Sequence, residues 1–183
     1  MNTLYLERSS DGCRSGDWVE RLDLADVGRI VVGTGPGSFA GIRAALAFAQ
    51  GYAIGRRCEV LGLPSACAIA AQVHATTGRE PGTLAVVGDA RRGMAWVALF
   101  NGHALEREIF QVKQEELAAA VPAGCRVTTP DAQRIGDLLR ETFGERYLGG
   151  QTPTAEGLRL FAEANPAMLK PEPLPIYLNP AVR

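Results

Sequence analysis

The stretch that decides the fold of this chain is Val32-Gly33-Thr34-Gly35-Pro36-Gly37-Ser38-Phe39-Ala40-Gly41-Ile42-Arg43. It continues a β-branched run that predicts a buried strand over Arg29–Val32. Ser38 is placed to cap a helix over Phe39–Ile54, and Gly55 is placed to end it. A strand, a glycine-rich turn and a helix in this order are typical of an α/β lobe.

The glycine-rich turn resembles a phosphate-binding loop, because a helix N-terminus behind glycines presents free N–H groups to an anion. A Walker loop places Lys and Ser or Thr after its last glycine, whereas an isoleucine follows Gly41 here. The dinucleotide spacing G-x-G-x-x-G is also absent, since Ser38 stands where a third glycine is needed. The candidates for binding a nucleotide phosphate are Gly35, Gly37, Ser38 and, farther along the chain, Asp89.

The helix predicted over Phe39–Ile54 carries a single charged residue, Arg43, and much of its surface is alanine or glycine. A helix at a protein surface normally shows a polar face. One side of this helix is therefore expected to cover the sheet and the other to meet a second surface closely. That surface is either another element of the chain or a partner protein. The interface residues expected for a partner are Phe39, Ile42, Arg43, Leu46, Ala47 and Gln50.

The remaining pattern predicts two lobes, residues 1–80 and 81–183, with a hinge at Glu80–Gly82. Further strands are expected over Thr3–Leu6, Glu59–Leu61, Leu84–Val87, Met94–Phe100, Ala104–Val112, Arg126–Thr128, Arg146–Leu148 and, as an edge strand, Ile176–Leu178. Further helices are expected over Ser65–Thr77, over Gln114–Ala120, over Pro130–Phe143 with Thr129 as its cap, and from Thr152–Pro153 to just before Asn165.

The charged turn Asp89–Gly93 lies between two apolar strands and allows two interpretations. Arg91 and Arg92 could bind an anion or position RNA. Alternatively, the turn is a hairpin tip held by a local ion pair between aspartate and arginine.

The residue inventory contains no recognisable catalytic or metal-binding constellation. His74 and His103 are the only histidines, neither has a ligand at metal spacing, and each is expected to be a solvent-facing or incidental residue. The four cysteines form no C-x-x-C pair, which favours reduced thiols in a cytoplasmic protein. A net charge of −1 argues against strong sequence-independent binding to nucleic acid, and no apolar run is long enough to span a bilayer.

Several stretches together resemble the TsaB (YeaZ) family. Val32–Arg43 is similar to the family signature G-x-G-P-G-S-F-T-G-[VI]-R, and Asp89–Gly93 is similar to its turn D-A-R-[MR]-G-E. The likeness also covers Ala49–Gly51, Leu63–Ser65, Pro153–Leu158 and Pro175–Leu178.

This resemblance implies an α/β fold of the actin/Hsp70-like ATPase (ASKHA) type, with two related lobes of mixed sheet and flanking helices. TsaB is the inactive paralogue of the catalytic subunit TsaD and acts as a scaffold in forming N6-threonylcarbamoyladenosine at position 37 of tRNA. The implied partners are a TsaD-like subunit in a heterodimer and a TsaE-like ATPase, with tRNA contacted only indirectly. No bound cofactor is implied for this chain, since ATP is used by the partner proteins.

The chain departs from the family at its N-terminus. Glu7-Arg8-Ser9 stands where the family has Asp-Thr-Ser at the end of its first strand. The family carries further strands and a first helix before its signature turn. The stretch between Cys13 and Arg29 is too short for that helix, which implies a reduced N-terminal lobe. Two other functions stay open: a small nucleotide-binding enzyme that uses Gly33–Gly41 and Asp89, and a self-associating homologue that buries the Phe39–Ile54 helix in a homodimer.

Overall fold

The structure is a computed structural model that describes residues 2–10, 24, 26–77 and 82–178. The chain divides into two units: unit 1 contains residues 1–68 and 153–176, and unit 2 contains residues 69–152 and 177–183. This division differs from the predicted boundary at residue 80, because residues 153–176 return to the first sheet. Most of the predicted hinge Glu80–Gly82, and most of the stretch between Cys13 and Arg29, lie outside the described residues.

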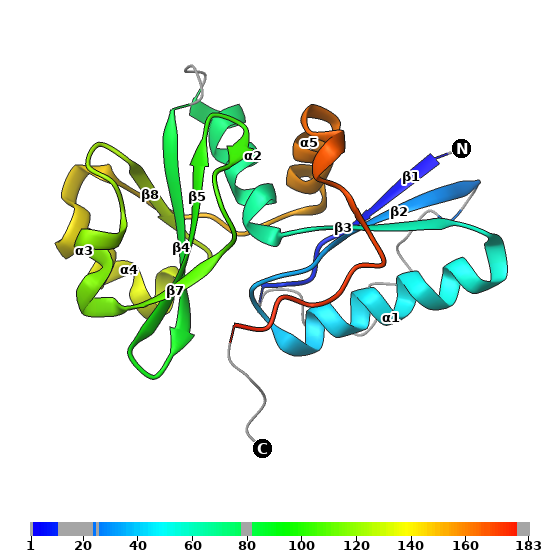
Figure 1. Ribbon diagram of the computed structural model, residues 1–183, viewed down its shortest axis with the longest axis horizontal. Coiled ribbons are helices and arrows are strands. Elements are labelled where there is room, and N and C mark those ends of the chain that lie inside the picture. The colour runs from blue at the N-terminus through cyan, green and yellow to red at the C-terminus, as the bar shows by residue number, and fades with distance from the viewer. Residues whose placement is uncertain (1, 11–23, 25, 78–81, 179–183) are drawn as a thin grey trace. The chain divides into compact units, whose positions relative to one another are not determined.

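Unit 1 is built on a four-stranded sheet in the order β1-β2-β3-β10 (Figure 1). Its strands are β1 (Asn2–Leu6), β2 (Val27–Gly33), β3 (Glu59–Leu63) and β10 (Lys170–Pro171). The first three run parallel, and β10 pairs antiparallel with β3. Residues Ile30–Val32 of β2 are at most 1% exposed, which is the reason for the continuous β-branched run: a parallel strand covered on both faces has no polar side.

Two helices cover the faces of this sheet. On one face, α1 (Phe39–Arg56) packs its buried side against apolar residues of β1 and β2. On the opposite face lies α5 (Ala155–Ala164), as Figure 1 shows, and Tyr5 of β1 is within electrostatic reach of Arg159 and Glu163 there. A single turn of 3-10 helix, Pro166–Met168, leads from α5 to β10.

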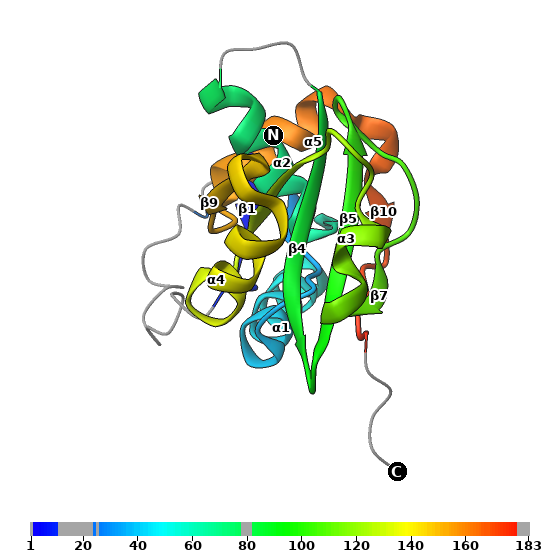
Figure 2. The ribbon, with the colours of Figure 1, turned by 90° about the vertical axis from the view of Figure 1, so that its left-hand side faces the viewer.

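Unit 2 contains a mixed sheet in the order β6-β5-β4-β8-β9, with β7 also paired to β5. Its strands are β4 (Thr83–Arg91), β5 (Met94–Asn101), β6 (Ala104–Leu105), β7 (Phe110–Lys113), β8 (Arg126–Thr129) and β9 (Tyr147–Gly150). The pairs of β4 with β8 and of β8 with β9 are parallel, and the others are antiparallel. Figure 2 shows β4 and β5 as one long hairpin.

The core of unit 2 lies on one face of this sheet. Alternate residues of β4 such as Ala85 and Val87 point to it, as the two-residue period of a strand requires. The helices α3 (Leu117–Ala120) and α4 (Ala132–Phe143) add Leu117 and Leu139, both fully buried. The 3-10 turns Gln114–Glu116 and Gly144–Arg146 flank them, and α2 (Ser65–Thr77) enters unit 2 from Ile69 onward.

The predicted mixed α/β class is confirmed, but some predicted elements are wrong in detail. The strand expected over Ala104–Val112 is broken: β6 and β7 pair with different parts of β5, and the exposed charged residues Glu106–Glu108 lie between them. No strand forms over Ile176–Leu178; the N–H of Ile176 donates to Thr34 O at 2.8 Å, and the short edge strand is β10 instead.

Two predicted helix caps are displaced by two residues. Asp131 occupies the N-cap position of α4, and Thr129 Oγ1 instead accepts the Asp131 N–H at 3.0 Å. Thr154 caps α5 by accepting the Gly157 N–H, where the sequence favoured Thr152. None of the helices in the described ranges combines the length and apolarity that crossing a bilayer requires.

Of the two alternatives expected for the histidines, a solvent-facing position is wrong for His74. This residue of α2 is 7% exposed, and its ring meets the ring of His103 edge-on, with 5.3 Å between the centroids. Burial lowers the pKa of His74, and the nearby His103 and Arg126 lower it further, against a hydrogen bond to the Gly102 backbone that raises it.

A depressed histidine pKa makes the folded protein less stable in acid. The unfolded chain takes up a proton near pH 6.5, at which the folded protein keeps His74 neutral, so stability is fully present above that pH and declines below it. We therefore expect His74→Gln to flatten the decrease of Tm between pH 7.5 and 5.5, measured by thermal unfolding. His103→Gln, at an exposed position, serves as the comparison and should change the profile less. An unchanged pH profile in His74→Gln would contradict this explanation.

Candidate functional site

The glycine-rich turn of unit 1 joins β2 to α1 and is tied to the next strand and helix. Thr34 N–H and Thr34 Oγ1 both donate to Leu63 O, at 2.8 and 3.0 Å. Gly35 N–H donates to Ser65 Oγ at 3.0 Å, and Ser65 N–H donates to Gly35 O at 2.8 Å. The turn is therefore held in place through its own backbone.

The glycines of this turn are required by the segment Glu7–Ser9 that lies against it. A Cβ atom on Gly33 would overlap the Glu7 carboxylate. A Cβ atom on Gly37 or on Gly41 would overlap the carbonyl oxygen of Ser9 or of Arg8. The backbone of the first loop thus packs directly on the turn and on the first turn of α1, at a distance that only glycine permits.

Two of the candidate phosphate-binding residues of this turn, Gly35 and Ser38, already make hydrogen bonds within the chain. Ser38 N–H donates to Ser9 O at 2.6 Å, and Ser38 Oγ accepts the N–H of Gly41 at 3.4 Å. A phosphate at this helix N-terminus would have to compete with Ser9 O for the Ser38 donor. Gly35, Gly37 and Ser38 lie together in unit 1, whereas Asp89 belongs to unit 2.

Glu7 places a carboxyl group inside this closed arrangement. The residue is 8% exposed, and its Oε1 accepts the Ser9 N–H at 2.7 Å. Burial raises the pKa of Glu7, while hydrogen bonds from Ser9, Ser65 and the Arg8 backbone partly offset that rise. The Glu7 carboxyl group thus fills the space beside Gly33 that a side chain at that position would need.

The second feature of unit 1 is the side of α1 that faces away from the sheet, which we call the outer face. It consists of the exposed residues Phe39, Ala40, Arg43, Ala44, Ala47, Gln50, Gly51 and Ile54. Phe39 is 56% and Ile54 87% exposed, and Arg43 is the only charged member; its guanidinium lies 4.9 Å from the centre of the Phe39 ring. A helix face with so little polarity is unusual at a surface in contact with water.

The structure narrows the set of predicted interface residues. Phe39, Arg43, Ala47 and Gln50 lie on the outer face, as the prediction requires. Ile42 and Leu46, by contrast, are 3% and 5% exposed and belong to the core between α1 and the sheet. A partner bound to the outer face cannot contact them, because the helical period turns these two positions inward.

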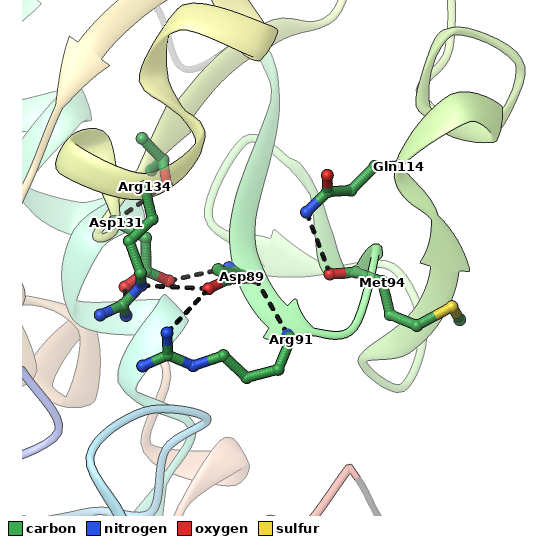
Figure 3. Close-up of polar contacts among 7 residues, drawn as sticks. Asp89, Arg91, Met94, Gln114, Asp131 and Arg134 are labelled. Atoms are coloured by element: carbon green, nitrogen blue, oxygen red, sulfur yellow. Dashed lines mark hydrogen bonds and ion pairs between the residues drawn. The ribbon is translucent and has the colours of Figure 1, made fainter.

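In unit 2, Asp89 is the centre of a polar network at the end of β4 (Figure 3). Its Oδ1 accepts the Arg91 N–H at 2.9 Å, and its Oδ2 lies 3.5 Å from Arg91 Nη1 and 3.1 Å from Arg134 Nε. Asp131 Oδ2 accepts the Asp89 N–H at 2.8 Å, and Asp131 also pairs with Arg134. Burial raises the pKa of Asp131, against the Asp89 N–H and Arg134, which lower it.

The local Asp–Arg pair considered for the turn Asp89–Gly93 is thus present, but it is part of a larger network. Sequence reasoning missed Asp131 and Arg134, which lie about forty residues from Asp89 and are brought to it only by the pairing of β4 with β8. The only available signal was the position of Asp131 three residues beyond the predicted strand Arg126–Thr128, in the first turn of the predicted helix.

Within the described ranges, no three or more His, Cys, Asp or Glu side chains come together in a way that could hold a metal ion. Cys58, Cys67 and Cys125 are free and buried thiols. Burial raises the pKa of Cys67, which disfavours a nucleophilic thiolate there.

Comparison with known proteins gives one family and a set of related folds. Residues 20–123 match the family described as TsaD, tRNA N6-adenosine threonylcarbamoyltransferase. A solved structure of YeaZ from Pseudomonas aeruginosa aligns with a TM-score of 0.68 and 23% identity, over 86% of this chain and 77% of that one. An uncharacterised protein with similarity to peptidase YeaZ, also from Pseudomonas aeruginosa, aligns with a TM-score of 0.67 and 24% identity, over 86% and 76%. No curated protein is a significant match.

These likenesses confirm the predicted fold class. Mixed sheets with flanking helices, arranged as in YeaZ, are those of the ASKHA-type fold.

The close approach of the Arg8 carbonyl to Gly41 predicts a difference between two glycines of the same helix. Gly41→Ala should lower the free energy of unfolding by about 2 kcal/mol, since a Cβ atom there must displace backbone. Gly51→Ala, where no atom lies within 4 Å of the added Cβ, should raise it by about 0.5–1 kcal/mol through better helix propensity. Chemical denaturation of both variants measures the difference. Equal changes in the free energy of unfolding would show that the close approach of the Arg8 carbonyl does not require glycine at position 41.

The raised pKa of Glu7 predicts that its ionisation costs stability. The stabilising contribution of the neutral acid is fully present below the unfolded pKa of 4.5 and is lost as the pH rises through the folded pKa. Glu7→Gln should therefore raise Tm at neutral pH relative to the natural chain, and this advantage should shrink in acid. Glu108→Gln, at an exposed position, is the control and should show no such trend. A Glu7→Gln variant whose Tm difference grows in acid would contradict the assignment.

Proposed function

Since the chain belongs to the TsaD family of tRNA N6-adenosine threonylcarbamoyltransferases, we propose that it is a non-catalytic partner subunit in the formation of threonylcarbamoyladenosine. In this proposal the chain acts as a scaffold and the chemistry takes place on a TsaD-like catalytic subunit. The observation that carries it is the outer face of α1, which exposes Phe39 and Ile54 and has Arg43 as its one charged residue.

The composition of the outer face supports a protein partner. Exposed alanine and glycine at Ala40, Ala44, Ala47 and Gly51 allow the backbone of another helix to approach closely. Phe39 and Ile54 at the two ends provide apolar area that association would remove from water. The occupant we assign is a TsaD-like subunit, and a second copy of this chain is the alternative that the experiment distinguishes.

The closed glycine turn supports a role without nucleotide chemistry on this chain. Its helix N-terminus donates to Ser9 O and Ser38 Oγ, and Glu7 occupies the space beside Gly33. In this proposal ATP is used by the partner proteins, a TsaE-like ATPase joins the assembly, and the complex works in the cytoplasm.

The proposal predicts that a negative charge added to the outer face weakens pairing. Ala47→Glu should weaken the complex with the TsaD-like subunit of the same organism by roughly 100-fold, because burying an added carboxylate in an almost uncharged interface costs several kcal/mol. Ala118→Glu, an exposed alanine on α3 of unit 2, is the matched control and should pair normally. Calorimetry or sizing with light scattering measures both.

Three outcomes of that experiment would count against the proposal. One is no complex between the natural chain and the TsaD-like subunit at low and moderate salt. Another is equal pairing by Ala47→Glu and the control. A homodimer that Ala47→Glu dissociates, without any heterodimer, would show that the outer face serves self-association instead. In the cell, depletion of the protein should reduce threonylcarbamoyladenosine in bulk tRNA.

A further inference from the structure

The tip of the hairpin between β4 and β5 holds two arginines in a backbone conformation that most side chains avoid. The φ angles of Arg91, Arg92 and Gly93 are 67°, 53° and 73°, all in the left-handed region. Glycine and asparagine are usual at such positions, and for other residues the conformation costs about 1 kcal/mol each. Both arginines are exposed. The tight hairpin requires this backbone conformation, so the choice of arginine in place of glycine or asparagine calls for another reason.

The tip is held firmly by its neighbours. Gln114 N–H donates to Gly93 O at 2.9 Å, and Gln114 Nε2 donates to Met94 O at 3.5 Å (Figure 3). On the other strand, Asp89 Oδ1 accepts the Arg91 N–H. The backbone that carries the two arginines is therefore fixed on both sides, and the entropic cost of ordering it on binding is largely avoided.

Beside the tip, two guanidinium groups converge on one oxygen atom. Arg91 Nη1 and Arg134 Nε lie 3.5 and 3.1 Å from Asp89 Oδ2, and Figure 3 shows both groups on the same side of Asp89. The Asp89 side chain is 9% exposed, whereas that of Arg91 is 65% exposed. The carboxylate thus positions the guanidinium groups from the inside, and Arg91 keeps most of its N–H donors accessible to solvent.

The positive charge of this region is concentrated at the tip. Arg91, Arg92 and Arg134 stand against Asp89 and Asp131, which leaves one positive charge in excess on the tip and the network, and the exposed Glu116 is the nearby acid that offsets it. The neighbouring pair of Lys113 and Glu115, 3.5 Å apart, is neutral, and Glu116 next to it adds one exposed acid. The positive charge is therefore confined to the tip and not spread over a broad surface.

We propose that Arg91 and Arg92, with Arg134 beside them, form a phosphate-binding site that contacts the sugar-phosphate backbone of RNA. A planar guanidinium group offers two parallel N–H donors to a phosphate, which is the geometry that such anions prefer. Contacts of this kind position an RNA without reading its sequence. The choice of RNA over a small phosphate as the ligand rests on the proposed function. The phosphate-binding site itself is inferred from the arginines of the hairpin tip and their contacts.

The test compares two double variants that remove the same charge. Arg91→Asn with Arg92→Asn removes the tip arginines while keeping a residue that tolerates positive φ. Arg56→Asn with Arg57→Asn is the matched control, since this pair is also exposed and Arg57 also has positive φ, at 51°. Fluorescence anisotropy with labelled tRNA, from low to moderate salt, measures binding by the full chain, and Tm verifies folding.

The tip variant should bind tRNA roughly 5–10-fold more weakly at low salt, and its salt slope should decrease by about 1 to 2, one for each phosphate that the arginines no longer neutralise. The control should bind nearly as the natural chain does. An equal decrease in affinity in both variants, or no decrease in either, would overturn the site, as would a natural chain that binds no tRNA at low salt.

A second measurement separates RNA from a small phosphate. If inorganic phosphate or ATP shifts the backbone amide resonances of Arg91 and Arg92 while tRNA binding does not depend on them, RNA is the wrong ligand. Pairing with the TsaD-like subunit is measured on the same variants and should be unchanged. If the tip variant binds tRNA more weakly but pairs normally, the phosphate-binding site is confirmed. If it binds tRNA and pairs as the natural chain does, the phosphate-binding site is overturned and the proposed function is not affected. Absence of pairing by the natural chain would count against the proposed function.

Discussion

Unit 1 depends on the close approach between the segment Glu7–Ser9 and the N-terminus of α1. Three glycines, Gly33, Gly37 and Gly41, leave room for a backbone or carboxylate atom where any Cβ would overlap it. Because the loop after β1 then lies directly on the turn after β2, the two parallel strands and the helix between β2 and β3 are locked together. The hydrogen bond from Ser38 N–H to Ser9 O completes the arrangement.

The same constraint determines what α1 can do. With its first turn fixed, the helix directs Ile42, Ala45, Leu46 and Ala49 into the core, and the opposite face receives whatever residues remain. In this chain these residues are almost uncharged. The glycine-rich turn resembles an anion-binding loop, but in this structure it mainly fixes the orientation of α1. The outer face of α1 is therefore the stronger candidate for function.

Unit 2 uses a different device, in which sheet pairing brings distant residues together. Parallel pairing of β4 with β8 places the ends of both strands at one edge of the sheet, so that Asp131 meets Asp89. Asp89 pairs with the guanidinium groups of Arg91 and Arg134, and the hairpin tip beside them stays charged. In unit 2, as in unit 1, groups with little exposure to solvent thus position exposed residues, here Arg91 at the hairpin tip.

The sequence by itself determined the mixed α/β class, the strand Arg29–Val32, the start of α1 at Phe39 and the presence of a charged hairpin at Asp89–Gly93. These follow from periodicity, capping residues and glycine, which act over a few neighbouring residues. The predicted stop at Gly55 is wrong, since α1 continues to Arg56 and Arg57 is its C-cap. Only the tertiary structure decided which predicted interface residues are buried, how the region from Ala104 to Val112 divides and that His74 is inside. It also decided which residues complete the network of Asp89. Those features depend on contacts between segments far apart in the chain, which no local pattern encodes.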